Sequence, residues 1–375
     1  MPTSISLTIL MGIVVYLAYT SDKKVIEVHT ITGTYKRERV FVFLIILSLS
    51  LYAALRTRGN DTTGYIKHFI EPIYFGIGDF FSNGGWVDSK GPLFTLFLTA
   101  CKYHLSDNYH IFFFIIALIT NGSIVIFLRR YSCNFPIAIF LYLAMDGYGV
   151  SLTGMRQALA TAIVIWTIPA ATKKKWISFA IMLFLAYQIH FISILFLVVP
   201  FLRKKIWNYS VVILTILSII AAFYFEGFSD LMLDASSSLG FTYQNSAILG
   251  TGVNILRVMV YLVPGVMALV YKNRLLETEE IDKICINSSV VGGALAGIGL
   301  NGNANTFGRI GLLFEPCIYI ALPSIIEKVF DNDTKRTVYI TMVILFLIYY
   351  LFGLLKNGFW TDYYGLTSVF DAFLT

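Results

Sequence analysis

The chain has 375 residues, of which 57% are hydrophobic and 16% aromatic, while only 13% are charged. Soluble domains average about 25% charged residues, so this composition excludes an ordinary soluble protein and predicts a polytopic membrane protein. The net charge of +6 is no signature of nucleic-acid binding, because the basic residues cluster in short loops between apolar runs, where they orient a chain in a membrane.

Apolar runs follow one another along the whole chain as candidate membrane spans. A bilayer core needs about 20 helical residues, and fewer where a helix is short or recessed. We therefore expect an all-α polytopic membrane protein: a bundle of about 12–14 transmembrane helices, some short or re-entrant, in a single integral membrane domain over residues 1–375. The candidate spans are 4–19, 40–56, 91–105, 110–128, 136–150, 156–172, 176–189, 190–202, 210–225, 254–271, 284–300, 308–326 and 337–355.

Basic clusters between these runs predict the orientation of the chain. The strongest clusters are at 23–24, 36–39, 129–130, 173–175, 203–205, 272–274 and 335–336. The positive-inside rule places them all in the cytoplasm, so that external loops fall at 57–90 and 226–253 and the C-terminal tail lies outside. Between Arg39 and Arg129 the chain must then cross an even number of times. Because three apolar runs lie there, either 65–82 crosses or re-enters, or 91–105 only dips into the membrane.

Basic side chains also occur near or within apolar runs, away from the cytoplasmic clusters. These are Arg58, Arg156, His190, Arg257 and Arg309. Helix rise places the last four roughly 25, 20, 22 and 28 Å from the cytoplasmic side. In a hydrocarbon core of ~30 Å they share one level near the outer leaflet. Ionisable groups near lipid are costly, so this layer predicts a recessed, positively charged functional site.

The stretch that carries His190 predicts a turn. Residues 176–202 are mostly apolar and lie between two basic clusters that both favour the cytoplasm. One straight helix would place the second cluster outside. We therefore expect two short helices, with residues 188–190 at a turn inside the outer leaflet.

Each of these residues also has a structural interpretation. His190 is alternatively a hydrogen-bonded core residue, and the arginines in the apolar runs are alternatively interfacial side chains that extend to the headgroups. Arg156 favours a cavity wall, because the polar Gln157 adjoins it. Arg58 and Asp61 alternatively pair with each other and hold their loop.

Arginine suits a diphosphate ligand, since its planar fork makes bidentate hydrogen bonds and remains charged. The few acidic residues on the outer side form no DxD or ExxH arrangement, which argues against a Mg²⁺-dependent nucleotide-sugar site. The sequence thus predicts no metal site and a metal-independent way of holding a diphosphate leaving group.

Several short motifs follow one another in a familiar order. They are RTRGNDTTGY at 56–65, GPLFTLF at 91–97, MRQALA at 155–160, QIHFIS at 188–193 and NTFGR at 305–309. In order and spacing the chain resembles the EpsG-type branch of the Wzy-like polysaccharide polymerases over most of its length. Arg58, Asp61, Arg156, Gln157 and His190 fall on positions that match the family pattern. Gly91 departs from it, because an acidic residue is expected there in many relatives.

The resemblance implies a bacterial inner-membrane glycosyltransferase for O-antigen, capsule or exopolysaccharide assembly. Its substrates would be undecaprenyl-diphosphate-linked oligosaccharides on the periplasmic side. It implies no cofactor and no nucleic acid, membrane lipid as its surroundings, and a chain-length regulator protein as a further candidate partner.

Within that reading, Arg156, Arg257 and Arg309 would bind the diphosphate, with Arg58 and Gln157 as further substrate-binding residues. His190 or Asp61 would accept the proton of the attacking hydroxyl; histidine titrates near neutral pH, which suits that role. Two alternatives remain open: a lipid-linked oligosaccharide flippase or transporter, and a membrane-bound O-acyltransferase.

Overall fold

The computed structural model describes the backbone of residues 2–23, 27–30, 33–36, 38–89, 91–238, 252–301, 308–356 and 361–373. The chain divides into two compact units. Unit 1 comprises Met1–Ile163, Leu185–Phe191 and Val338–Thr375, and unit 2 comprises Val164–Phe184 and Ile192–Thr337. Each unit is described by itself, and the single integral membrane domain stays a prediction.

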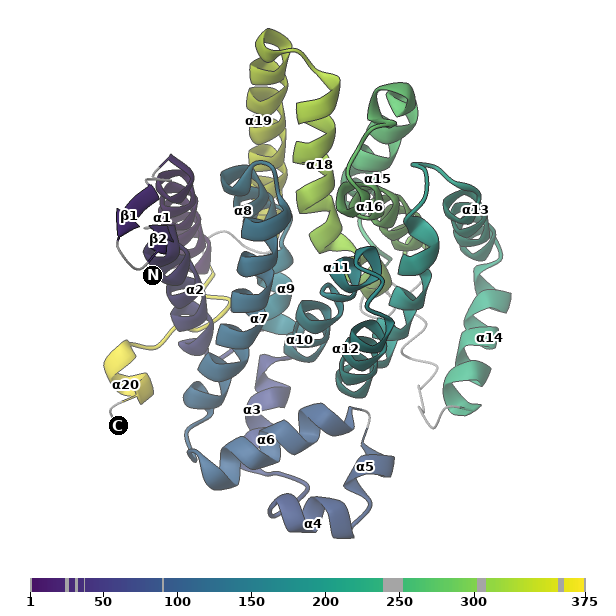
Figure 1. Cartoon of the computed structure of the whole chain (residues 1–375). Coiled ribbons are helices and arrows are strands. Elements are labelled where there is room, and N and C mark those ends of the chain that lie inside the picture. The colour runs from purple at the N-terminus through teal and green to yellow at the C-terminus, as the bar shows by residue number, and fades with distance from the viewer. Residues whose placement is uncertain are drawn as a thin grey trace. The chain divides into compact units, whose positions relative to one another are not determined.

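Unit 1 is built from helices and one short hairpin (Figure 1). Its elements are α1 (Thr3–Lys23), β1 (Glu27–Thr30), β2 (Gly33–Lys36), α2 (Glu38–Ala54), α3 (Thr62–Ile70), α4 (Ile77–Ser82), α5 (Gly85–Asp88), α6 (Pro92–His104), α7 (Tyr109–Tyr131), α8 (Phe135–Ala144), α9 (Gly147–Thr153), α10 (Met155–Val164), most of α19 (Asn332–Lys356), and α20 (Val369–Phe373). The antiparallel hairpin pairs Glu27 with Lys36 and Thr30 with Gly33. Helix α2 packs against both α1 and α7.

The described elements of unit 2 are all helices. Its elements are α11 (Thr167–Thr172), most of α12 (Trp176–Ile189), most of the 3₁₀ helix η1 (Phe191–Leu202), α13 (Tyr209–Phe223), α14 (Phe225–Ser238), α15 (Ile255–Val270), η3 (Lys272–Leu275), α16 (Glu280–Ile298), α17 (Gly308–Leu312) and α18 (Glu315–Val329). Helix α16 is central, because it packs against α13, α15, α17 and α18. One cluster of its core joins Ile286 to Ala268, Ala321 and Ile325.

Asparagine side chains begin several of these helices. The side-chain oxygen of Asn108 accepts a hydrogen bond from the first turn of α7, and those of Asn134, Asn208 and Asn254 do the same for α8, α13 and α15. Such caps satisfy backbone N–H groups that have no partner within the helix. Proline at the first turn of α6 and α8 needs no such partner.

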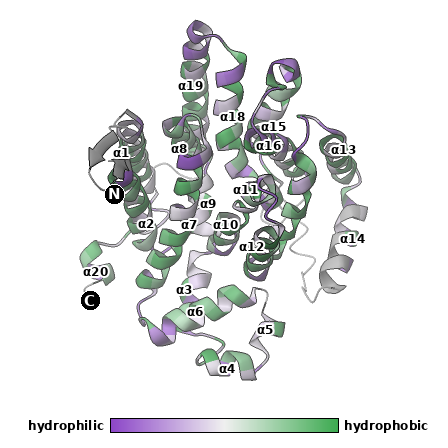
Figure 2. Ribbon diagram, viewed as in Figure 1, coloured by the Kyte–Doolittle hydropathy of each residue, from purple (hydrophilic) through white to green (hydrophobic). Residues whose placement is uncertain are grey.

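Long apolar helices confirm an all-α polytopic membrane protein. Four described helices are long and apolar enough to cross a membrane: Thr3–Asp22, Tyr109–Tyr131, Glu280–Ile298 and Asn332–Lys356. The number rises to six if the bent pairs α8–α9 and α13–α14 each form one span. Shorter apolar helices are Arg39–Ala54, Trp176–Ile189, Phe191–Leu202 and Ile255–Val270. Figure 2 shows α19 as hydrophobic beyond its hydrophilic turn with α18. The expected 12–14 spans therefore include many segments too short to cross alone.

The topology of the first third is decided by the ends of α2 and α7. The Nδ1 atom of His110, in the first turn of α7, lies 2.7 Å from the carbonyl oxygen of Ala54 at the end of α2. Residues 55–108 thus leave and return at the same end of unit 1. Helix α6 has only 13 residues and is too short to cross a bilayer alone, which favours the alternative in which 91–105 only dips into the membrane.

The two predicted external loops contain helices. Residues 57–90 carry α3, α4 and α5, which join α6 in a group of short helices (Figure 1). The second segment, 226–253, begins inside helix α14, and residues 239–251 lie outside the described part of the chain.

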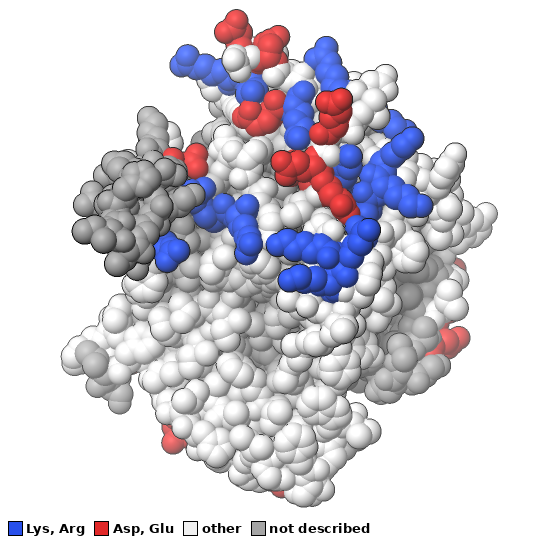
Figure 3. Space-filling model, viewed as in Figure 1, with Lys and Arg blue, Asp and Glu red and all other residues white. Residues whose placement is uncertain are grey.

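In the upper part of Figure 3, Lys and Arg side chains lie intermixed with acidic ones. Ion pairs join Arg203 to Glu280, Lys328 to Asp282 and Lys335 to Glu327. The guanidinium of Arg203 also lies 5.6 Å from the ring of Trp176. The chain therefore enters α12 and leaves η1 at the same end of unit 2, as the hairpin prediction requires.

Candidate functional site

The loop after α2 presents two arginines in opposite environments. Arg56 is buried, with 1% of its surface exposed, whereas the side chain of Arg58 is 64% exposed. The guanidinium of Arg56 lies 4.3 Å from the ring centre of Phe113, and its Nη1 donates to the carbonyl of Ala53. Its Nε and Nη2 atoms have no hydrogen-bond partner among the described residues. Sequence reasoning selected Arg58 and missed Arg56, whose only signal was its place directly after an apolar helix.

Burial governs the electrostatics of Arg56. Desolvation lowers the pKa of Arg56 to about 10, and nearby tyrosines act in the opposite direction. The side chain therefore keeps its charge at neutral pH. At a given distance, a charge in a dry environment interacts more strongly with other charges than it would in water, because the effective dielectric constant is lower.

The C-terminal segment holds this loop in place. The backbone N–H groups of Thr57 and Arg58 both donate to the carbonyl of Tyr364, each at 3.0 Å, and the Thr57 hydroxyl donates to that of Gly365 at 2.6 Å. Arg58 Nη2 pairs with Asp362 Oδ2 at 3.6 Å. Sequence reasoning considered Asp61 as the partner of Arg58 and did not connect Asp362 with it. Residues 361–367 thus fix the shape of the loop.

Asp61 occupies the N-cap position of α3 and is half-buried, but its side chain makes no capping hydrogen bond. The next residue, Thr62, is buried, and its hydroxyl donates to the carbonyl of Leu152 at 3.4 Å. This contact brings the start of α3 to the end of α9, two residues before the Gly154 break that precedes α10. Asp61 and Arg156 are therefore placed in one region of unit 1.

Arg156 and the turn that carries His190 meet at Gly91. A Cβ atom on Gly91 would lie 2.5 Å from the carbonyl oxygen of Ile189 and 3.3 Å from Cδ of Arg156. The backbone N–H of Arg156 donates to the Tyr65 hydroxyl at 3.4 Å. Gln157 is buried, and Arg156 is half-buried, with its Nε unpartnered within the described ranges. Gly91 and Tyr65 are site residues that sequence reasoning did not assign.

The predicted turn at 188–190 is confirmed. Helix α12 ends at Ile189 and η1 begins at Phe191, so His190 lies at the break between them. Its backbone N–H donates to the carbonyl of Ala186 at 2.8 Å, and its ring stacks on that of Phe191 with centroids 5.6 Å apart. The imidazole is half-buried, which suits a group that exchanges protons with a ligand.

Arg257 and Arg309 belong to unit 2, where they share one end. Arg257 lies in the first turn of α15 and Arg309 in α17, and both are half-buried. The N–H of Val253 donates to the carbonyl of Gly299 at 2.7 Å, and a Cβ on Gly299 would lie 3.0 Å from Cα of Gly308. The starts of α15 and α17 therefore meet at the end of α16, while residues 302–307, which include most of the NTFGR motif, lie outside the described residues.

Unit 1 thus collects five of the seven predicted site residues, and unit 2 collects the other two. Guanidinium and amide groups next to a half-buried imidazole and a carboxylate can bind an anion and accept a proton beside it. Within the described ranges, no three His, Cys, Asp or Glu side chains are grouped as metal ligands, and metal independence stays a prediction.

Comparison with known proteins gives one match. Residues 39–367 match the EpsG family, so the match includes every motif from the Arg58 loop to the C-terminal segment that holds it. No curated protein and no solved structure matches the chain significantly. The chain is a multi-pass membrane protein, and the match supports a polysaccharide polymerase that acts in polysaccharide biosynthesis. Because the matched range covers most of the sequence, the chain belongs to the EpsG family.

Proposed function

We propose that this protein polymerises lipid-linked oligosaccharide repeats on the outer side of the bacterial inner membrane. The growing glycan is transferred from undecaprenyl diphosphate to the non-reducing end of a new lipid-linked repeat. The observation that carries this proposal is the convergence of Arg156 and the His190 turn at Gly91, beside the loop of Arg58 and Asp61.

The reaction needs an anion site and a proton acceptor. The acceptor hydroxyl oxygen attacks the anomeric carbon of the growing chain, and the bond from that carbon to the diphosphate oxygen breaks. The diphosphate leaves with the electron pair, and the hydroxyl proton passes to a base. Arg156 with Gln157 and Arg58 would hold the diphosphate. Preorganised donors of this kind stabilise developing negative charge.

His190 is the favoured base and Asp61 its rival. The imidazole lies at the turn whose Ile189 carbonyl approaches Gly91, whereas Asp61 lies at the start of α3. Both are half-buried, so each has access to a ligand. The test is polymer yield and length in a deletion strain that expresses His190→Ala or Asp61→Asn. We expect His190→Ala to lower yield by about 10²–10⁴-fold, the usual contribution of a general base. Full-length polymer from His190→Ala together with none from Asp61→Asn would reverse the assignment.

The deletion strain also separates polymerisation from its alternatives. Loss of a polymerase leaves single lipid-linked repeats displayed outside, which run as a one-unit band. Loss of a flippase or transporter leaves no repeats outside, and loss of an O-acyltransferase leaves polymer of normal length. The one-unit band supports the proposal, and either other pattern contradicts it.

A further inference from the structure

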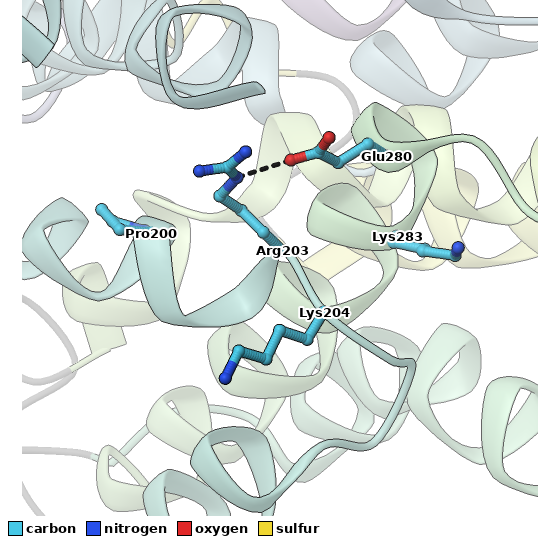
Figure 4. A pocket seen from close by; sticks show the side chains of 5 residues that line it. All are labelled: Pro200, Arg203, Lys204, Glu280 and Lys283. Atoms are coloured by element: carbon cyan, nitrogen blue, oxygen red, sulfur yellow. Dashed lines mark hydrogen bonds and ion pairs between the residues drawn. The ribbon is translucent and has the colours of Figure 1, made fainter. Parts of the chain in front are cut away.

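A cavity of about 380 Å³ lies between the end of η1 and the start of α16 in unit 2 (Figure 4). It is lined by Pro200, Arg203, Lys204, Glu280 and Lys283. Three of the five lining residues are cations and one is an anion, so the cavity carries an excess of positive charge. We call it the η1–α16 cavity.

Arg203 is held by its surroundings but keeps donors available. Its Nε donates to Glu280 Oε1 at 2.5 Å, and its guanidinium lies over the ring of Trp176. Among the described residues no hydrogen bond or ion pair involves its two Nη groups. A guanidinium with a fixed plane and free N–H groups is suited to a phosphate, because less freedom is lost when it binds.

The two lysines extend the basic lining. Figure 4 shows Lys204 and Lys283 reaching away from the Arg203–Glu280 pair on different sides. Within the part of the chain that the structure describes, neither ammonium has an ion pair. Lysine stems are flexible, so both charges can turn toward an anion in the cavity. Glu280 neutralises only one of the three cations, so the lining keeps a net positive charge that an anion can balance.

Apolar side chains beside the cavity point to the origin of such an anion. On η1, Leu197 and Phe201 precede Arg203, and Phe201 is 63% exposed. Trp176, at the start of α12, is also exposed, and tryptophan is enriched where a membrane meets water. A phospholipid would place its phosphate at the cations and an acyl chain along Leu197 and Phe201. Helix α16 separates this cavity from Arg257 and Arg309, which lie at its other end.

We propose that the η1–α16 cavity binds a phosphate-bearing anion, and that an anionic phospholipid headgroup is the source that its apolar border favours. Such a ligand would hold this end of unit 2 at the membrane surface. The proposal does not depend on the polymerase reaction, because none of the lining residues belongs to the candidate functional site.

The test is native mass spectrometry of the purified full-length chain in detergent, titrated with phosphatidylglycerol or phosphatidylcholine. The variant Lys204→Gln/Lys283→Gln removes two lining charges. The matched control Lys173→Gln/Lys272→Gln removes two exposed charges from the same basic end of unit 2, outside the cavity. A second arm measures the melting temperature of each protein with inorganic pyrophosphate.

We expect phosphatidylglycerol to bind more tightly than phosphatidylcholine. The lining variant should weaken that binding by about 30-fold, which corresponds to about 2 kcal/mol for two lysines near a headgroup. The control variant should change it little. Protection by pyrophosphate alone, lost only in the lining variant, would retain the anion site but assign it to a soluble ligand. Equal loss in both variants, or loss in neither, would overturn the proposal.

Discussion

The Gly91→Ala variant tests the packing at the centre of the candidate site. The added Cβ would lie 2.5 Å from the Ile189 carbonyl oxygen, whereas Cβ atoms essentially never come within 3.0 Å of another heavy atom. The backbone at Ile189 must therefore move by at least 0.5 Å, the difference between these two distances. Because the obstacle is backbone and not the end of a flexible side chain, His190 moves with it.

The cost of this shift follows from known behaviour of packed sites. Overpacking costs about 1–3 kcal/mol of stability. Displacement of a reacting group by 1 Å can cost about 10²-fold in rate, so a shift of half that size should cost on the order of 10-fold. We expect Gly91→Ala to lower both the melting temperature of the purified protein and the polymer yield in a complemented deletion strain.

Gly64→Ala is the matched control. Gly64 lies within α3, nothing would lie within 4 Å of its added Cβ, and alanine favours a helix by about 0.5–1 kcal/mol over glycine. This variant should keep full activity and at least wild-type stability. Wild-type polymer yield and melting temperature from Gly91→Ala would refute the close approach of Gly91 to the His190 turn.

Three further variants or treatments test other parts of the structure. Asn108→Ala removes the cap of α7 and the hydrogen bond from its Nδ2 to the Ala372 carbonyl, and should lower the free energy of unfolding by about 1–2 kcal/mol. Asn108→Asp keeps the cap and should recover that part of the stability. Equal losses from both variants would show that the cap contributes nothing. Asp362→Asn keeps an acceptor for Thr3 and Gly365 but removes the charge opposite Arg58. Because exposed ion pairs contribute about 0–1 kcal/mol, the melting temperature should stay the same while polymer yield falls several-fold. Unchanged yield would show that Arg58 needs no orientation by Asp362. Polymerisation by isolated membranes should persist after treatment with EDTA, and a loss restored by Mg²⁺ would refute metal independence.

Titration of Arg56 should leave stability near neutral pH unchanged. Burial lowers its pKa to about 10 from 12.5, so the folded protein releases this proton before the unfolded chain does. The burial penalty is therefore fully present below about pH 10 and is relieved only as the pH rises above it.

Much of the candidate site was predictable because its residues stand out chemically. Charged groups are rare in apolar runs, so Arg156 and His190 could be recognised without a structure, and the basic clusters on both sides of 176–202 predicted the turn at His190. The family match over residues 39–367 is consistent with the motif order in the sequence.

Other features could not be predicted because they depend on contacts between distant segments. Nothing in the sequence shows that Asp362 lies beside Arg58, or that Arg56 is the buried member of its pair, since both follow from how residues 361–367 pack on the loop. Gly91 looked like a departure from a family pattern. In the structure, the space where its side chain would lie is taken by the backbone of Ile189.

The sequence by itself determined the membrane class, the family motifs and the costly cations, because composition and local spacing carry that information. The tertiary structure decided that residues 55–108 leave and return at the same end of unit 1, since the contact of His110 with Ala54 joins the start of α7 to the end of α2. It also divided the predicted cations between two units: Arg156 and His190 meet around Gly91, whereas Arg257 and Arg309 meet at the end of α16. Hydrophobicity and charge set the depth of a residue in a membrane, but only packing sets its neighbours.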